Sequence, residues 1–227
     1  MQTTLQIGGK SIRLYTFEPR TPNPHPALLL LHGAGGNAEF WLDQLAPPIA
    51  RAGVAVYAVH YFDRTATTRA DLLTISDGIH VPLWLATVRE ALTYIAARST
   101  VDPTRIALVG ISLGAFLSLA VATQPETPPI QAIVEVSGGL VPPYDANATS
   151  AFPPTLILHG DADTVVSVNH AHALDARLRH LNVAHQIHIF RGETHFFSDA
   201  TRLRILTETA TFLGHHLHPS EPHSNVS

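Results

Sequence analysis

The sequence contains no cysteine, which excludes disulfide bonds, thiolate metal ligands and a cysteine nucleophile together. It also lacks an excess of basic residues: Lys and Arg number 14 against 18 Asp and Glu, for a formal net charge of −4. Proteins that bind nucleic acids normally carry a basic surplus that is concentrated on one face. A nucleic acid is therefore not among the partners that we expect for this chain.

Long apolar segments are absent too. The longest aliphatic run, Ala27–Leu31, is far shorter than the roughly 20 residues that a membrane span requires. The first residues, Met1–Leu5, show neither the basic start nor the apolar stretch of a secretory signal. We therefore expect a cytoplasmic protein without membrane contact. The 227 residues, 45% apolar and 14% charged, predict one well-buried domain.

Strand-like and helix-like patterns alternate along the chain. The expected strands cover residues 3–7, 11–17, 27–31, 54–60, 105–111, 130–136, 155–159 and 184–190, and the expected helices cover 38–52, 83–98, 113–123, 168–181 and 200–216. Gly8 and Gly9 predict a hairpin turn between the first two strands. The alternation predicts a single α/β domain over residues 1–216, with a mostly parallel sheet, helices on both faces and the hairpin as an antiparallel edge.

Two segments show little periodicity. Residues 62–82 form a long connection between a strand and a helix, of the kind that often serves as a lid or a binding loop. Residues 217–227 contain proline, serine and asparagine and predict a flexible C-terminal tail. We expect neither segment to form a second domain.

The residues Gly110–Gly114 form the pattern Gly-x-Ser-x-Gly, with Ser112 at its centre. An apolar strand precedes the pattern and a helix follows it, so the serine falls on a strand-to-helix turn. Small neighbours permit the strained backbone that exposes a serine hydroxyl at the carboxyl end of a strand, where α/β sheets bind ligands. Ser112 is therefore a candidate nucleophile. The alternative is an ordinary helix-capping serine between packing glycines.

A serine nucleophile needs a histidine base and an acid that orients the histidine. Two candidate acids, Asp161 and Asp163, follow one apolar strand, and His195 follows the next. The order Ser, Asp, His along the chain is the one expected for this architecture. We favour Asp163 because it lies deeper in its loop and has more reach toward a histidine. Asp161, nearer the strand end, remains a second candidate that could instead cap the turn.

The chain has 15 histidines, and His195 is distinguished from the others by its position. It lies in a glycine-containing loop between the last strand and the last helix, which makes it the expected base. His185 and His188 stand three residues apart on one strand and so face opposite sides, which does not suit a shared metal ion. We therefore expect no metal site.

A loop of small residues follows the strand 27–31. Its sequence, His32–Asn37, is His-Gly-Ala-Gly-Gly-Asn, so hardly any side chain separates a substrate from the backbone N–H groups. The N–H group of Ala34, together with that of Leu113, would form an oxyanion hole. The loop lacks the Lys-Ser/Thr pair of a phosphate-binding loop, which argues against a nucleotide.

These residues together resemble the α/β-hydrolase superfamily, and within it the dienelactone-hydrolase-like family. The resemblance covers about residues 10–216 and rests on five segments: His32–Gly36, Tyr61–Arg64, Gly110–Gly114, His159–Asp163 and Thr194–Phe197. It implies a mostly parallel sheet of seven or eight strands and no cofactor. It also implies that the acid is the aspartate that ends His-Gly-x-x-Asp, which is Asp163. Ser112 stands where dienelactone hydrolases have a cysteine.

The expected function is that of a serine hydrolase that cleaves a small-molecule carboxylic ester or lactone through a Ser-His-Asp triad and an acyl-enzyme. A serine peptidase or a thioesterase would use the same triad on another acyl group, and a non-catalytic ligand-binding protein would use the same fold. Four aromatic residues are candidates to line the substrate pocket, with core packing as the alternative: Trp41, Tyr61, Phe62 and Phe197. A homodimer is compatible with the sequence.

Overall fold

The computed structural model describes residues 1–21 and 24–217. In helix α1 (Ala38–Arg51), the side chains of residues 40, 41 and 43–45 lie outside this description, so the prediction for Trp41 does too. The expected tail, residues 217–227, falls outside the described residues except for Leu217, which ends the last helix. Among the described residues, no helix is long and apolar enough to cross a membrane.

Eight strands form one sheet within the described residues, in the order β1-β2-β4-β3-β5-β6-β7-β8. Their bounds are β1 Gln2–Ile7, β2 Lys10–Phe17, β3 His25–Leu31, β4 Ala55–Val59, β5 Val101–Ile111, β6 Ala132–Val136, β7 Thr155–Gly160 and β8 His185–Phe190. β1 and β2 form the predicted hairpin, and β2 pairs antiparallel with β4. Each pair from β4 to β8 is parallel, so the carboxyl ends of six strands meet at one edge.

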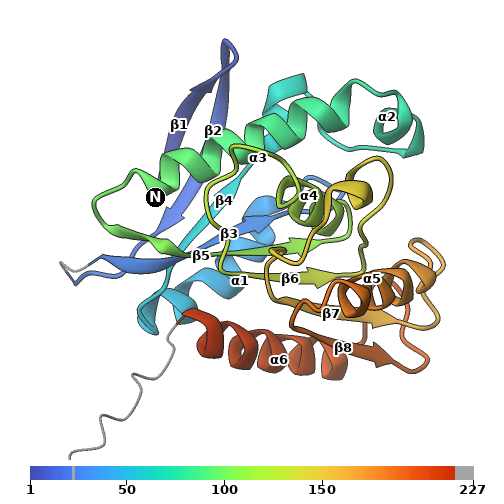
Figure 1. Ribbon diagram of the computed structural model, residues 1–227. Helices are drawn as coiled ribbons and strands as arrows, with labels where there is room; N and C mark the ends of the chain where they lie inside the picture. Colours follow the sequence, from blue (N-terminus) through green and yellow to red (C-terminus); the bar gives the residue numbers. More distant parts are fainter. Residues whose placement is uncertain (22–23, 218–227) are drawn as a thin grey trace, which may run out of the picture.

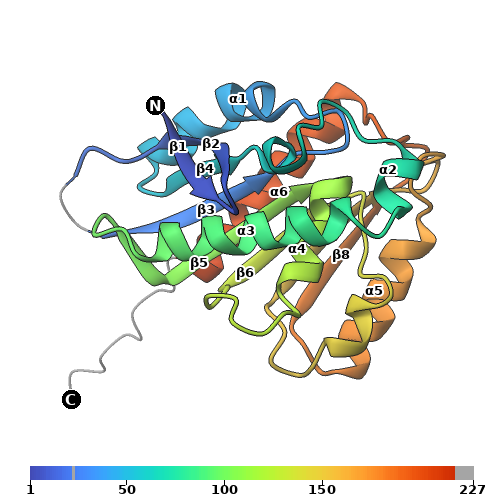
Figure 2. The same cartoon turned by 90° about the horizontal axis from the view of Figure 1, so that it is seen from above.

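Helices cover both faces of this sheet, as Figures 1 and 2 show from two directions. Besides α1, they are α2 Leu72–Ser76, α3 His80–Ala96, α4 Leu113–Val121, α5 Asn169–His180 and α6 Asp199–Leu217, with short 3₁₀ turns at Tyr61–Thr65 and Tyr144–Asn147. Apolar side chains of α1 and α6 share one core cluster, and those of α3, α4 and α5 share the other. The predicted mostly parallel sheet with helices on both faces is confirmed.

Strand β3 shows why the sequence favours this layering. Leu28 and Leu30 belong to the core cluster beneath α1 and α6, whereas Leu29 and Leu31 belong to the cluster beneath α3 and α4. Successive side chains of a strand point to opposite faces, so a strand covered on both sides must be apolar throughout. The uninterrupted run Ala27–Leu31 is therefore the sequence of a central strand.

The connection at residues 62–82 is more regular than its sequence pattern indicates. It contains most of the 3₁₀ turn Tyr61–Thr65, the short helix α2 and the start of α3, which begins at His80. Aspartate side chains accept hydrogen bonds at the start of both helices: Asp71 Oδ1, at the N-cap of α2, accepts one from Thr74 N at 2.8 Å, and Asp77 Oδ1, two residues before the N-cap of α3, accepts one from His80 N at 3.0 Å. Capping by short polar side chains leaves no mark on apolar periodicity. A role as a lid remains a prediction.

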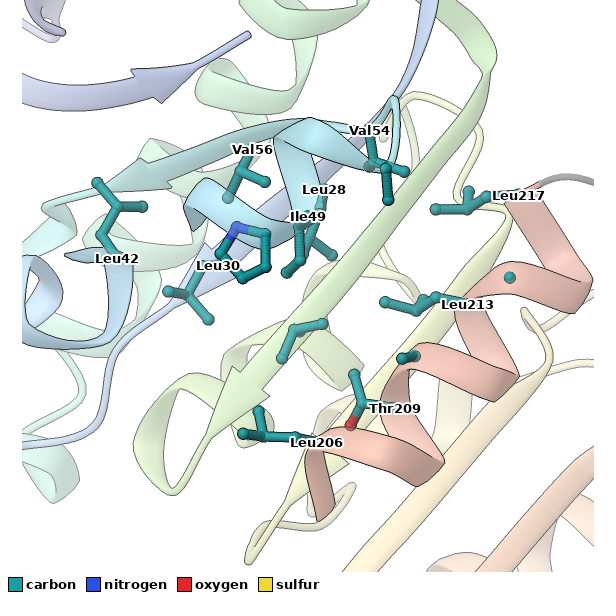
Figure 3. Close-up of a pocket in the computed structure, with 15 residues that line it drawn as sticks. Leu28, Leu30, Leu42, Ile49, Val54, Val56, Leu206, Thr209, Leu213 and Leu217 are labelled. Carbon is teal, nitrogen blue, oxygen red and sulfur yellow. The ribbon is translucent and has the colours of Figure 1, made fainter. Parts of the chain in front are cut away.

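An apolar cavity of about 370 Å³ lies between α1 and α6, over strands β3, β4 and β5 (Figure 3). Leucine side chains reach into it from the sheet and from both helices, as Leu28, Leu42 and Leu213 do. α6 presents small residues there, among them Ala210 and Gly214. A Cβ placed on Gly214 would meet nothing within 4 Å. The space thus arises in part from the small residues of α6.

This open space allows a prediction about Gly214. Gly214→Ala should raise the free energy of unfolding by about 0.5–1 kcal/mol, because alanine loses less backbone entropy in a helix and the site has room. Gly53 is the matched control, since its Cβ would also meet nothing within 4 Å, but its φ of +88° lies in the left-handed region. Gly53→Ala should lower the free energy of unfolding by about 1–2 kcal/mol. Urea titrations check both values, and a loss of stability in Gly214→Ala would contradict the prediction.

Candidate active site

Ser112 sits on the sharp turn between β5 and α4, with φ 54° and ψ −119°. Two glycines make the turn sterically feasible. A Cβ on Gly110 would lie 2.3 Å from the carbonyl oxygen of Gly114, and a Cβ on Gly114 would lie 2.1 Å from that of Leu31. The Ser112 side chain makes no capping hydrogen bond to α4, which disfavours the interpretation as an ordinary helix-capping serine.

The structure brings Ser112, His195 and Asp163 together at the carboxyl edge of the sheet. His195 Nε2 lies 3.0 Å from Ser112 Oγ, and His195 Nδ1 lies 2.7 Å from Asp163 Oδ2. The three residues follow β5, β8 and β7, whose parallel arrangement places their carboxyl ends at the same edge of the sheet. This chain of contacts joins a hydroxyl, an imidazole and a carboxylate in the arrangement that catalysis by a serine nucleophile would require.

The environment of Asp163 favours its ionised form. Burial opposes ionisation, but the N–H groups of Val166 and Val165, each 2.8 Å from Oδ1, and the ring of His195 outweigh it, so the pKa of Asp163 lies below its usual range. Asp161 does not contact His195. Its Oδ1 accepts a hydrogen bond from Gly192 N at 2.6 Å and holds the loop after β8. Of the two candidate acids, only Asp163 is placed to orient the histidine.

The small-residue loop after β3 lies against the serine, since a Cβ on Gly33 would be 3.4 Å from Ser112 Cβ. His32 anchors this loop: its Nδ1–H donates to the carbonyl of Gly33 at 2.8 Å, and its ring stacks on Tyr61 with centroids 4.1 Å apart. Burial lowers the pKa of His32 to about 4, so the ring is neutral near pH 7. Leu113 begins α4, where an N–H group has no acceptor within the helix.

The structure corrects the expected pocket lining. Tyr61 and Phe62 are both fully buried (0% exposed), and the Tyr61 hydroxyl donates to the carbonyl of His32 at 2.6 Å. Both rings belong to the apolar core and lie under the loop after β3, which they support. Phe197 is partly buried and packs edge-on against Phe190, with centroids 6.0 Å apart, in the cluster beneath α6. The rings of Tyr61 and Phe62 are therefore closed to an arriving substrate, whereas Phe197 is partly exposed and its role stays a prediction.

Phe196 is the aromatic residue that the sequence analysis missed. Its side chain is 72% exposed, and its ring stands edge-on to the ring of His195 with centroids 5.6 Å apart. Apolar periodicity does not identify such a residue, because it lies in a loop. Its only signal in the sequence is that it directly follows the candidate base.

The histidines on β8 point to different partners. His185 Nε2 lies 3.0 Å from Asp175 of α5, whereas His188 Nε2 lies 3.7 Å from Glu208 of α6, on the other face of the sheet. Throughout residues 1–21 and 24–217, no group of three or more His, Asp and Glu side chains is arranged so that it could hold a metal ion.

The strand order, the glycine-flanked turn and the three clustered side chains define an α/β-hydrolase. Residues 12–211 match the model of the dienelactone hydrolase family. Because this match spans most of the chain, the protein belongs to the dienelactone hydrolase family.

Solved structures share the fold. A dienelactone hydrolase-like promiscuous phosphotriesterase from metagenomic libraries has a TM-score of 0.81 and 19% identity, and the match covers 95% of this chain and 97% of that one. An esterase from the planctomycete Thermogutta terrifontis, solved with butyrate bound, has a TM-score of 0.76 and 16% identity, with 97% and 96% of the chains covered.

A mouse protein, acyl-coenzyme A thioesterase 5, is 32% identical over 112 residues. The match covers 49% of this chain and 24% of the thioesterase, so the two proteins are alike over a part of their lengths.

The buried His32 generates a prediction about acid stability. Its pKa is about 4 in the fold against 6.5 in the unfolded chain. The contribution of this group to the free energy of unfolding is therefore fully present above pH 6.5 and is lost as the pH falls toward 4. Between pH 6.5 and pH 5 the loss from this group should be about 1.5 kcal/mol. The variant His32→Asn should not show this loss of stability, whereas His172→Asn, on the exposed side of α5, should show the same loss as the wild type. Urea titrations at both pH values measure the difference; an unchanged pH slope in His32→Asn would refute the assignment.

Proposed function

We propose that the protein is a serine hydrolase that cleaves carboxylic esters, with Ser112 as nucleophile, His195 as general base and Asp163 as the residue that orients the histidine. One observation carries the proposal: the contacts from Asp163 Oδ2 to His195 Nδ1 at 2.7 Å and from His195 Nε2 to Ser112 Oγ at 3.0 Å. Both distances lie within hydrogen-bond reach, as transfer of a proton between these groups requires.

In the proposed reaction, His195 Nε2 takes the proton from Ser112 Oγ while the oxygen attacks the ester carbonyl. Asp163 accepts the hydrogen bond from Nδ1–H, which fixes the tautomer and stabilises the imidazolium. Collapse of the tetrahedral intermediate breaks the ester bond, and His195 gives its proton to the leaving alcohol. Water, deprotonated in turn by His195, then attacks the acyl-enzyme, and His195 returns this proton to Ser112 Oγ as the carboxylic acid and the free serine are released.

The negative charge of the tetrahedral intermediate needs donors that are already in place. We assign this role to the backbone N–H groups of Ala34 and Leu113. Two observations support this assignment. The loop at Gly33 lies close to Ser112, and the N–H group of Leu113, the first residue of α4, has no acceptor within the helix. Each donor in such a site contributes about 3 kcal/mol to the stabilisation of the transition state.

Acyl thioesters are the second candidate substrates, because the mouse relative that is 32% identical over 112 residues is an acyl-coenzyme A thioesterase. The butyrate-bound esterase of the same fold supports a small carboxylic ester instead. Exposed Phe196, edge-on to His195, offers an apolar contact for either substrate. A panel of acetate and butyrate esters, a lactone, an acyl thioester and a peptide would rank the substrate classes by kcat/KM.

The assignment of Ser112 predicts a single reactive serine. A fluorophosphonate should add one adduct to the wild-type protein and none to Ser112→Ala or His195→Ala, as read from the intact mass. Ser112→Ala should also lower kcat on p-nitrophenyl acetate by roughly 10⁴- to 10⁶-fold while leaving thermal stability nearly unchanged. Ser99→Ala, an exposed serine on a helix-to-strand connection, serves as the control and should be labelled like the wild type. A folded wild type without an adduct would favour a ligand-binding protein.

The two neighbouring aspartates provide a matched test of the acid. Asp163→Asn should lower kcat by about 10⁴-fold, because the asparagine amide leaves His195 in the wrong tautomer. Asp161→Asn should stay within about threefold of the wild type, since Asp161 contacts Gly192 rather than the histidine. Steady-state kinetics on p-nitrophenyl acetate compare the two variants. A large loss in Asp161→Asn with little change in Asp163→Asn would reverse the assignment.

A further inference from the structure

Glu135 is a fully buried carboxyl group that the proposed reaction does not use (0% exposed). It lies on β6, and its Cα pairs with that of Gly110, the first glycine of the turn that carries Ser112. Ile133, two residues earlier on the same strand, belongs to the core cluster shared with α4. Side chains two residues apart lie on one face of a strand, so Glu135 points toward α4.

The carboxyl group has one hydrogen-bond partner among the described residues. Its Oε2 accepts a hydrogen bond from Gly138 N at 2.8 Å, and Oε1 has no partner there. A buried carboxylate with a single donor would be costly, which favours the uncharged acid. In agreement, burial raises the pKa of Glu135 to about 8, against the opposing effect of the Gly138 N–H group.

The turn that Glu135 holds is in direct contact with the serine turn. The carbonyl of Val136 accepts a hydrogen bond from Ser112 N at 2.8 Å. The next residues turn sharply, with Ser137 at φ 55°, and return to the carboxyl group through Gly138. A Cβ on Gly138 would lie only 2.4 Å from Ala115 Cβ, in the first turn of α4. The Glu135–Gly138 hydrogen bond therefore closes a loop whose backbone both supports and touches the Ser112 turn.

Few other titratable groups surround Glu135. α4 carries none, and those of β5, Asp102 and Arg105, are at the opposite end of that strand. His159 lies on the neighbouring strand β7, and His170 of α5 lies beside Gly139. Neither histidine contributes to the shift at Glu135, which comes from burial and from Gly138.

We propose that Glu135, as an uncharged carboxyl group, is a positioning residue that sets the Ser112 turn by holding the Ser137–Gly138 turn beneath it. The inference rests on the proposed function, because a shift of Ser112 changes kcat only if Ser112 is the nucleophile. Loss of the side chain would leave the Gly138 N–H group buried without an acceptor and would free the segment whose carbonyl holds Ser112 N. Ionisation of the carboxyl group in alkaline solution would disturb the same segment by burying a charge.

Two substitutions and the pH dependence of kcat test this role. Glu135→Ala should lower kcat on p-nitrophenyl acetate by about 10- to 100-fold at pH 7, with KM within about twofold, because the serine is displaced but the pocket is not. Glu135→Gln keeps an acceptor for Gly138 N, so it should restore kcat to within about threefold of the wild type. The wild type should lose activity reversibly above pH 8, and Glu135→Gln should not.

Controls separate this role from simple loss of packing. Ile133→Ala removes a buried side chain from the same face of β6, and it should lower stability while keeping the wild-type pH profile. Glu90→Gln, on the exposed side of α3, should also keep that profile. An alkaline loss of activity that persists in Glu135→Gln would overturn the proposal. A folded Glu135→Ala with wild-type kcat would overturn it too.

Hydrogen exchange keeps the inference distinct from the proposed function. In Glu135→Ala, a peptide covering residues 110–116 should exchange its amides faster than in the wild type and in Ile133→Ala, because the Ser112 N–H bond to Val136 is weakened. Faster exchange in a protein that never reacts with a fluorophosphonate would uphold the positioning role and reject the serine hydrolase. Unchanged exchange in folded Glu135→Ala would reject the positioning role alone.

Discussion

The site depends on the close approach of the start of α4 to the end of β3. A side chain at Gly114 would prevent this approach. Gly114 lies so near the carbonyl of Leu31 that a Cβ there would stand 2.1 Å from its oxygen. This approach brings the first turn of α4 next to the loop after β3, and these are the two segments to which we assign the donors of the proposed oxyanion hole. A larger residue at position 114 would force α4 away from β3 and would separate the two parts of the proposed oxyanion hole.

The remaining parts of the site come from the parallel order of the strands. β5, β7 and β8 end at the same edge, so residues that are far apart in the chain arrive together there. Backbone N–H groups within the loop after β7 fix the carboxylate of Asp163 before it meets His195. The geometry of the proposed triad thus rests in part on main-chain hydrogen bonds of a short loop, which hold it in advance of any substrate.

The features that could be predicted from the sequence are those with a strict local requirement. A strand buried on both faces needs an unbroken apolar run, as at Ala27–Leu31, and a strand-to-helix turn around a serine needs small neighbours, as at Gly110 and Gly114. The sequence favours Asp163 over Asp161 through its depth in the loop and through the family pattern, although apolar patterning alone does not separate the two. In the structure, their hydrogen-bond partners separate them.

Other features could not be predicted because they depend on tertiary packing. Tyr61 and Phe62 follow a strand end, as residues that line a pocket often do, yet the loop at His32 folds over them and buries both. Glu135 interrupts an apolar strand, and nothing in its local sequence shows that the turn two residues later supplies its hydrogen bond. The helix α2 is likewise specified by the Asp71 cap rather than by an apolar stripe.

The segment between β4 and α3 is joined to the loop beside the serine by one main-chain hydrogen bond, from Ala70 N to the carbonyl of Ala34 at 2.9 Å. This carbonyl belongs to the peptide unit between Ala34 and Gly35. The neighbouring peptide unit, between Gly33 and Ala34, carries the Ala34 N–H group. A displacement of residues near Ala70 would break this bond, while the contacts of His32 with Gly33 and Tyr61 would still hold the start of the loop. If the segment acts as the expected lid, a wider opening would therefore come at the expense of the proposed oxyanion hole, because the same hydrogen bond ties the two together.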